Sequence, residues 1–148
     1  MTRRVVTGLT EDGRSAIIID DTAPHFLSDG GAYIWRAAAL PADNGANSDE
    51  APADFDYDLF HDGGSNFFVI EMEPGTRSST HATDTLDFIV MLEGVVTLEL
   101  EAEEIQLRAG DTLVDRGVIH TWRNDGPDIV RYAVVTIPAH PVGSGRTV

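Results

Sequence analysis

The sequence predicts an all-β fold, a single antiparallel β-barrel or jelly roll. Short runs of β-branched and aromatic residues recur at intervals of roughly eight to twelve residues and are separated by Gly, Pro and Asp. No window shows the sustained 3.6-residue apolar period of a surface helix. Short strands with regular turn signals are typical of β-sandwiches and barrels.

Length and composition narrow the class of protein. A chain of 148 residues is long enough for one domain with a real core. Twenty-five acidic and ten basic residues give a net charge of −15, which argues against nucleic acid and membrane surfaces as partners. The chain has no cysteine and no apolar run long enough to span a bilayer. We therefore expect a soluble, cytoplasmic protein.

Residues 1–40 are predicted to form an N-terminal strand extension. Two apolar runs, residues 5–9 and 15–19, flank a turn that contains Asp12-Gly13, which is a hairpin signal. Residues 32–37 read as a further strand after Gly30-Gly31. We expect these strands to lie on the outside of the barrel or on a partner.

Residues 41–66 form an acidic loop in this prediction. Its acids and its Pro and Gly residues show no strand or helix period, and it is long for a passive connection. Phe55, Tyr57 and Phe60 interrupt the acids. A partly ordered loop over one mouth of the barrel is the interpretation that we favour.

The barrel core is predicted within residues 66–137, followed by a surface tail, residues 138–148. The expected strands cover residues 67–72, 86–92, 95–100, 104–108, 112–114 and 129–137.

Two motifs lie within this core. The first reads Gly75-x5-His81-x-Thr83-x3-Asp87-x6-Gly94, and the second runs from Gly110-Asp111 to His120-x3-Asn124. They resemble the two motifs of the cupin superfamily, G-x5-H-x-H-x3/4-E-x6-G and G-x5-P-x-G-x2-H-x3-N. Thr83 replaces the second His, Asp87 replaces Glu and Arg116 replaces Pro, and the second motif is one residue short.

The resemblance extends to a subgroup of small single-domain cupins. Members of that subgroup share an N-terminal segment similar to Arg3-Arg4-Val5-Val6-Thr7-Gly8 and another similar to Ile34-Trp35-Arg36. Cupins commonly dimerise through sheet extension, so the resemblance implies a homodimer. It also implies a cavity for a small-molecule ligand.

Strand alternation predicts which side chains enter the cavity. If Asp87 faces inward, Ile89 and Met91 follow, while Phe88, Val90 and Leu92 face the other way. By the same counting, Trp122 accompanies His120 and Thr83 accompanies His81.

The resemblance places His81, Asp87 and His120 at the family's metal site. Two His and one carboxylate suit a divalent metal (Fe, Mn or Zn) with open positions. Asp is shorter than Glu, however, and Thr83 is a poor ligand whose hydroxyl can instead hydrogen-bond His81 or Asp87. A polar cluster without metal is the alternative that we favour.

Three functions remain open from the sequence. The first is an enzyme of the lyase, isomerase, cyclase or decarboxylase type, in which Asp87 orients His81 or His120 and raises its pKa for acid–base chemistry on a small oxygenated metabolite. The second is a non-catalytic small-molecule-binding cupin, and the third is a metal-dependent dioxygenase. Substrate contacts are predicted for Thr83, Ile89, Met91, Trp122, Arg77 and Arg123, although either arginine has abundant acids to pair with instead.

Overall fold

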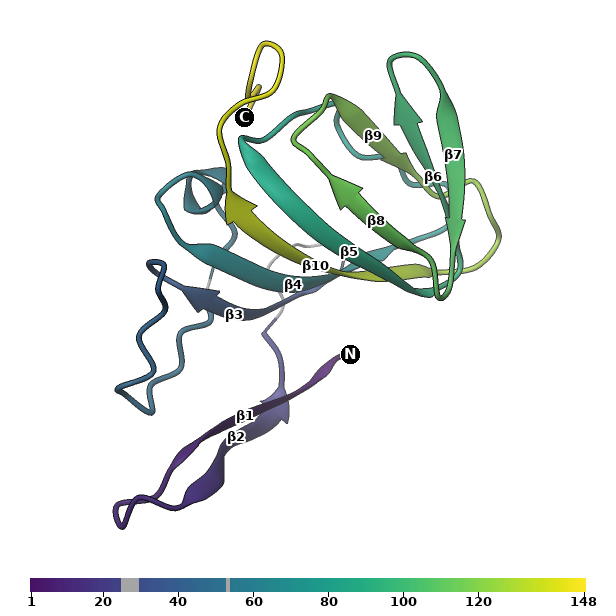
Figure 1. The fold of residues 1–148 in the computed structure, drawn as a ribbon. Coiled ribbons are helices and arrows are strands. Elements are labelled where there is room, and N and C mark those ends of the chain that lie inside the picture. The colour runs from purple at the N-terminus through teal and green to yellow at the C-terminus, as the bar shows by residue number, and fades with distance from the viewer. Residues whose placement is uncertain (25–29, 53) are drawn as a thin grey trace.

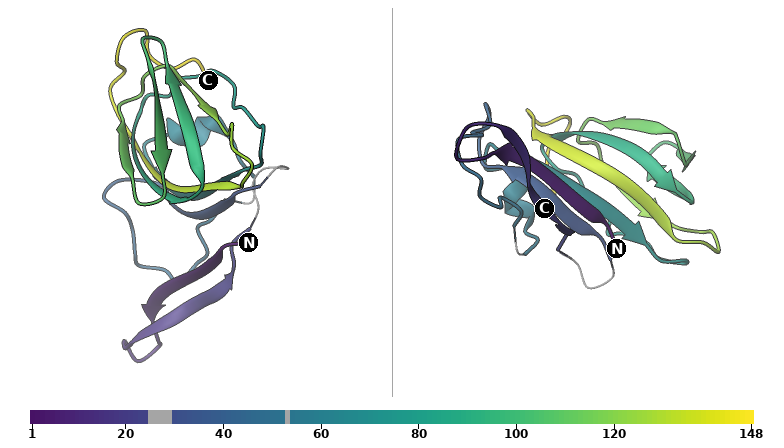
Figure 2. Two further views of the ribbon diagram at one scale, coloured as in Figure 1. Left: turned by 90° about the vertical axis from the view of Figure 1, so that its right-hand side faces the viewer. Right: turned by 90° about the horizontal axis from the view of Figure 1, so that it is seen from below.

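The computed structural model describes residues 1–24, 30–52 and 54–148. Two antiparallel sheets face each other, and a separate hairpin extends from them (Figures 1 and 2). The larger sheet has the order β3 (Ala32–Ala37), β4 (Ser65–Met72), β10 (Val130–Pro138), β5 (Thr85–Glu93), β8 (Thr112–Asp115). The smaller sheet has the order β7 (Glu104–Arg108), β6 (Val95–Leu100), β9 (His120–Arg123).

This arrangement confirms the all-β jelly-roll prediction and most of the predicted strands. β9 (four residues) is the exception: it was not among the predicted strands, although alternation had been applied to His120 and Trp122. A single turn of 3-10 helix, η1 (Tyr57–Phe60), interrupts the acidic loop. Among the described residues, no helix is long and apolar enough to cross a membrane.

The core lies between the two sheets. Met91, Val96, Leu98 and Val130 are each at most 2% exposed and belong to one continuous apolar cluster. Removal of such side chains from water stabilises the fold by roughly 1.5–3 kcal/mol each. The strand alternation predicted for β5 is confirmed, because Ile89 and Met91 are buried whereas Phe88 and Leu92 are each 48% exposed.

The N-terminal hairpin projects from the sheets as an arm (Figure 1). It consists of β1 (Arg3–Leu9) and β2 (Ser15–Thr22), joined through Gly13 at φ +79°. The buried guanidinium of Arg4 contacts both Asp21 and Asp49 at 2.7 Å. This ion pair ties the arm to the acidic loop, which crosses beside it.

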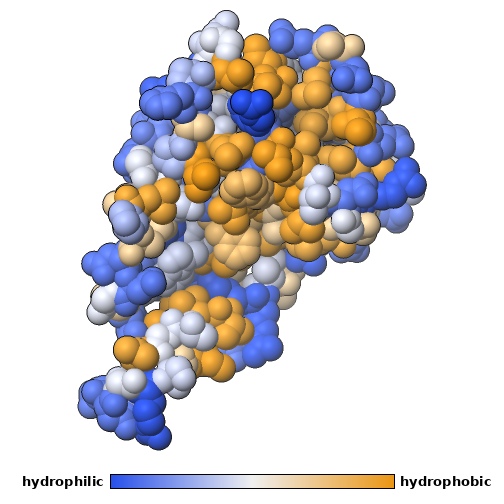
Figure 3. Space-filling view, in the orientation of Figure 1, coloured by the Kyte–Doolittle hydropathy of each residue, from blue (hydrophilic) through white to orange (hydrophobic). Residues whose placement is uncertain are grey.

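The outer face of the larger sheet carries a row of apolar side chains. Phe67 and Phe88 each lie opposite Val135 on β10, and Phe88 also lies opposite Val114 on β8. Phe67, Phe88 and Val114 are between 39% and 56% exposed. Figure 3 shows a continuous hydrophobic area over these strands.

The C-terminal tail is mostly exposed, and hydrogen bonds fasten it beside one end of the sheets. The Ala139 amide donates to the carbonyl of Asp84 and the Thr147 amide donates to that of Ala82, both at 2.9 Å. The tail therefore braces the chain that links His81 to β5.

Candidate active site

A cavity of about 520 Å³ opens between the two sheets. Its walls combine a polar cluster with aromatic and aliphatic side chains. The polar cluster comprises His81, Thr83, Asp87, Asp115 and His120, and the apolar wall includes Phe55, Tyr57, Phe60, Phe68, Ile89, Trp122, Tyr132 and Val134. The cavity is large enough for a small organic molecule.

His120 is held in one tautomer at the start of β9. Its Nδ1 lies 2.8 Å from the carbonyl oxygen of Val118 and 3.0 Å from Oδ2 of Asp115. Both oxygens accept, so Nδ1 carries the hydrogen and Nε2 of the neutral ring keeps its lone pair. His120 and Asp115 are almost completely buried. The ring is therefore oriented before any ligand arrives.

The turn between β8 and β9 places Asp115. Its Oδ1 accepts hydrogen bonds from the amides of Gly117, at 2.9 Å, and Val118, at 3.3 Å. Gly117 has φ +74°, and a Cβ atom there would lie 2.5 Å from the carbonyl oxygen of Thr83. Glycine is thus required both by the backbone conformation and by the close approach of a second chain segment.

His81 faces His120 across an isolated β-bridge. Their backbones exchange hydrogen bonds of 3.0 and 3.1 Å, and their ring centroids are 4.6 Å apart. Nδ1 of His81 lies 2.9 Å from the carbonyl oxygen of Ser79. Burial lowers the pKa of His81, contrary to the raised value expected from a carboxylate partner. The ring is consequently neutral at neutral pH.

Asp87 lies on β5 between Asp115 of β8 and Thr136 of β10. Its Oδ1 is buried and has no hydrogen-bond partner in the described part of the chain. Burial raises the pKa of Asp87 to about 7, the Thr85 hydroxyl lowers it by a smaller amount, and the nearby charge of Asp115 raises it further. Asp87 therefore exchanges its proton near neutral pH.

Two predicted contacts of this cluster are wrong. The carboxylate that pairs with His120 is Asp115 and not Asp87, because the turn after β8 brings Asp115 back towards the start of β9. The Thr83 hydroxyl bonds that of Thr85 at 2.7 Å, rather than His81 or Asp87. Within the described residues, the cluster leaves one of its polar atoms, Oδ1 of Asp87, without a hydrogen-bond partner.

The side chains do not fit a three-ligand metal site. Among the described residues, no three His, Asp or Glu side chains are grouped so as to hold a metal ion. His81, Asp87 and His120 therefore do not form such a group. Thr83 supplies no imidazole, and its hydroxyl is engaged with Thr85.

The predicted substrate contacts separate into two groups. Thr83, Ile89, Trp122 and Arg77 line the cavity. Met91 lies two residues further along β5 than Ile89, where it packs in the apolar core and does not reach the cavity.

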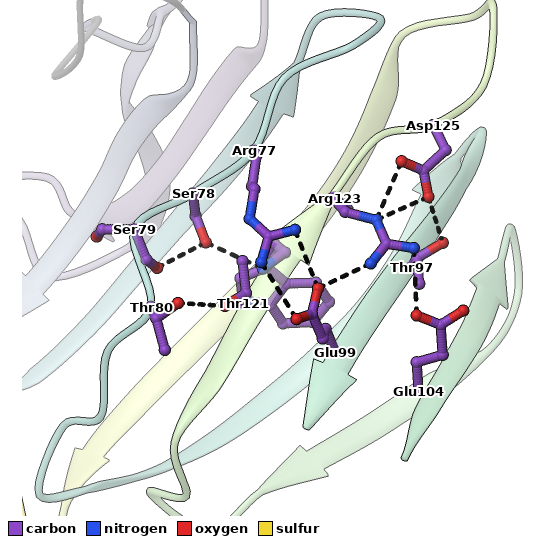
Figure 4. Close-up of polar contacts among 11 residues, drawn as sticks. Arg77, Ser78, Ser79, Thr80, Thr97, Glu99, Glu104, Thr121, Arg123 and Asp125 are labelled. Atoms are coloured by element: carbon purple, nitrogen blue, oxygen red, sulfur yellow. Dashed lines mark hydrogen bonds and ion pairs between the residues drawn. The ribbon is translucent and has the colours of Figure 1, made fainter. Parts of the chain in front are cut away.

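Arg123 lies outside the cavity lining, so the predicted substrate contact is wrong and the alternative pairing with acids is the one observed. Its guanidinium contacts Glu99, Glu104 and Asp125 at 2.7 to 3.2 Å (Figure 4). Arg77 reaches the same Glu99 at 3.0 Å. Both cations are therefore paired with acids.

Sequence reasoning missed Asp115, Tyr132 and Phe68 as cavity residues. The signal for Asp115 was an Asp-x-Gly turn five residues before His120, in which the side chain can accept amide hydrogen bonds. Tyr132 and Phe68 lie on strands whose apolar alternation does not distinguish a core wall from a cavity wall.

Two antiparallel sheets face each other and enclose a cavity with a polar cluster in its wall. This arrangement defines a jelly-roll protein with an internal cavity large enough for a small ligand. Residues 68–136 match the family model described as Cupin domain. The chain is thus a small cupin-fold protein.

Curated relatives extend the likeness beyond this domain. The chain is 36% identical over 86 residues to Phomopsin biosynthesis cluster protein D of Diaporthe leptostromiformis, covering 57% of this chain and 46% of that protein. It is 31% identical over 128 residues to Cupin-domain-containing oxidoreductase srdD of Neurospora crassa, covering 82% and 65%. The chain therefore spans about half of the first relative and under two thirds of the second.

Solved structures with similar strand arrangements include a Cupin 2 conserved barrel domain protein from Salinispora arenicola. It shares 18% identity and a TM-score of 0.47, over 51% of this chain and 64% of that one.

Proposed function

We propose that the cavity is the active site of an enzyme that transfers a proton between positions of a small organic substrate, a lyase- or isomerase-type reaction. The observation that carries this proposal is the buried Asp115–His120 pair, whose geometry leaves Nε2 of His120 as a preformed proton acceptor beside the cavity. The relatives of this chain include a biosynthesis cluster protein and an oxidoreductase, which favours an enzyme over a passive binder.

His120 acts as the general base in this proposal. Nε2 accepts a proton from a C–H or O–H bond of the substrate, and the ring becomes an imidazolium. The Asp115 carboxylate stabilises that positive charge through Nδ1–H, and its own bonds to two backbone amides keep it in place. General-base catalysis of this kind accelerates a reaction by roughly 10²- to 10⁴-fold.

Asp87 is the complementary acid. Because its pKa is raised to about 7, a large share of Asp87 is protonated at neutral pH and donates to the substrate. His81 stays neutral and offers a second ring nitrogen beside His120. One group is held ready to accept a proton and the other ready to donate one. Together they allow a proton to leave one substrate atom and another proton to be added elsewhere, with no net change in oxidation state.

Proton–deuterium exchange tests this function without knowledge of the substrate. A panel of small ketones, aldehydes and hydroxy-ketones is incubated in D₂O with the wild-type protein, and the loss of C–H signal is followed by NMR. We expect exchange on at least one member and its abolition in His120→Gln. His140→Gln, which alters an exposed histidine in the tail, serves as the matched control.

The two outcomes separate the alternatives. Undiminished exchange in His120→Gln would overturn the assignment of the base. No exchange on any member, together with tight retention of a ligand by the cavity, would favour the non-catalytic binding function instead.

A further inference from the structure

The walls of the cavity combine aromatic rings with an excess of acids. From this combination we infer that the cavity binds a small organic cation, an ammonium group carried on an apolar or aromatic body. The inference rests on the proposed function only in taking this cavity as the functional site. It concerns binding, and it does not depend on turnover.

The charge of the lining favours a cation over an anion, although one of its acids, Glu71, is itself paired with Arg131 at 3.2 Å. Among the described residues that line the cavity are five acids, namely Asp56, Glu71, Glu73, Asp87 and Asp115, and one arginine, Arg77. Arg77 already pairs with Glu99 at 3.0 Å. A carboxylate or phosphate would therefore enter a negative cavity without an uncommitted guanidinium to receive it, whereas a cation is attracted.

The floor of the cavity has a hydrogen-bond acceptor that needs a donor. Asp87 and Asp115 lie opposite each other on paired strands. The oxygens of Asp115 are occupied by His120 and two backbone amides, but Oδ1 of Asp87 has no partner among the described residues. Where Asp87 is ionised, above its pKa of about 7, an ammonium N–H would satisfy this oxygen and offset the repulsion between the two carboxylates.

The walls suit the rest of such a ligand. Trp122 and Tyr132 stack with centroids 4.9 Å apart, and Phe60 stacks on Phe68 at 5.8 Å. Phe55, Tyr57 and Phe60 pack edge to face around η1, with Tyr57 5.9 Å from His81. Aromatic faces attract organic cations and bury apolar bodies, and they do so more strongly where water is excluded.

Three probes of similar shape and different charge test the inference: 2-phenylethylammonium, 2-phenylethanol and phenylacetate. Trp35 lies outside this cavity, so a Trp35→Phe variant leaves Trp122 in the wall as the fluorescent reporter. Calorimetric titration of the wild-type protein checks the same ranking without a substitution. We expect the ammonium to bind at least tenfold more tightly than either of the other two probes at pH 8.

Asp87→Asn isolates the carboxylate, because the amide keeps the size of the side chain and removes its charge. We expect it to lose the preference for the ammonium over the alcohol while it binds the alcohol as the wild type does. Asp12→Asn, in the turn of the arm, is the control and should change neither. Thermal melting verifies that each variant is folded.

The contrary results are specific. Phenylacetate binding as tightly as the ammonium would overturn the inference, and so would an unchanged preference in folded Asp87→Asn. Because binding is measured without turnover, a failed exchange assay leaves a positive result standing. Conversely, exchange without any preference for the ammonium refutes this inference alone.

Discussion

Oδ2 of Asp115 lies 3.0 Å from Nδ1 of His120, and both side chains are buried beside a cavity whose other walls are largely apolar. The carboxylate is held by backbone amides on its other oxygen, so it cannot turn away without leaving those donors unpaired. This relationship fixes the free nitrogen of His120 and underlies the first prediction.

Asp115→Asn should impair exchange by roughly 10²- to 10⁴-fold and lower stability by about 1–3 kcal/mol, because the Val118 carbonyl loses its Nδ1–H donor. The Asn oxygen would accept from the Gly117 and Val118 amides, which turns the side-chain NH₂ towards Nδ1 of His120. That contact disfavours the Nδ1–H tautomer and places the hydrogen on Nε2, where it blocks proton uptake. The ¹⁵N shifts of the His120 ring report the tautomer directly. Asp125→Asn, on the surface, is the control, and an unaltered tautomer would contradict the argument.

Asp87 should make the folded state less stable as pH rises. Its pKa is raised from 3.8 to about 7 on folding, so between these values the folded chain holds a proton that the unfolded chain has released. The free energy of unfolding therefore falls as pH increases through this window, by up to about 4 kcal/mol if the full shift applies. Urea unfolding at pH 5 and pH 8 should show a smaller decrease for Asp87→Asn than for the wild type.

Affinity for 2-phenylethylammonium should increase between pH 6 and pH 8, because the Asp87 carboxylate becomes ionised over that range. The titratable groups around Asp87 are Asp115 across the β5–β8 pair and the two cavity histidines, His81 and His120; its neighbour on β10 is Thr136, which does not titrate there. Titrations in Asp87→Asn provide the comparison. A pH dependence that persists in this variant would assign the effect to another group.

Gly117→Ala should be destabilising and should reduce exchange. Its new Cβ would lie 2.5 Å from the Thr83 carbonyl oxygen in a backbone conformation with φ +74°. Gly75→Ala is a matched control, since Gly75 has φ +76° and open space around its Cβ position. Strain of φ alone costs about 1–3 kcal/mol in both variants. Chemical denaturation should therefore show a larger loss of the free energy of unfolding for Gly117→Ala than for the control. Only Gly117→Ala should displace His120. Equal effects of the two substitutions would refute the role of the close approach.

We propose that the apolar row on the outer face of the larger sheet is buried in a homodimer. Phe88 is 48% exposed at its centre, between Val114 and Val135. Phe88→Asp should shift the mass measured by sedimentation velocity from dimer to monomer, because a charge there would be desolvated in the interface. Ile105→Asp, at an exposed position of β7, should leave the mass unchanged. A wild-type monomer at micromolar concentration would contradict the proposal.

The fold was predictable because its determinants are local. Each signal is encoded within a few residues: the Asp12-Gly13 turn, the alternation along β5 and the Gly residues that bound the strands. The two motifs and strand alternation placed five residues in the cavity, and all five line it in the structure: His81, Thr83, Ile89, His120 and Trp122. β9 was not predicted as a strand, and its pairing with β6 is a contact between segments about twenty residues apart in the chain.

The partners within the site depend on contacts between distant segments. The sequence analysis named Asp87 as the carboxylate partner, but the turn at Gly117, which packs against Thr83, brings Asp115 to His120 instead. Whether Arg123 faces the cavity or the acids is likewise decided by the register of β6 against β9, which sets Glu99 beside it.

The sequence by itself therefore determined the all-β class, most of the strands and the histidines of the site, since turn chemistry and side-chain alternation act over short distances. Only the tertiary structure decided which carboxylate orients His120 and which one has an oxygen without a hydrogen-bond partner among the described residues. Those outcomes depend on the register and approach of strands that are remote in the chain, where a shift of one residue would exchange the inward and outward faces.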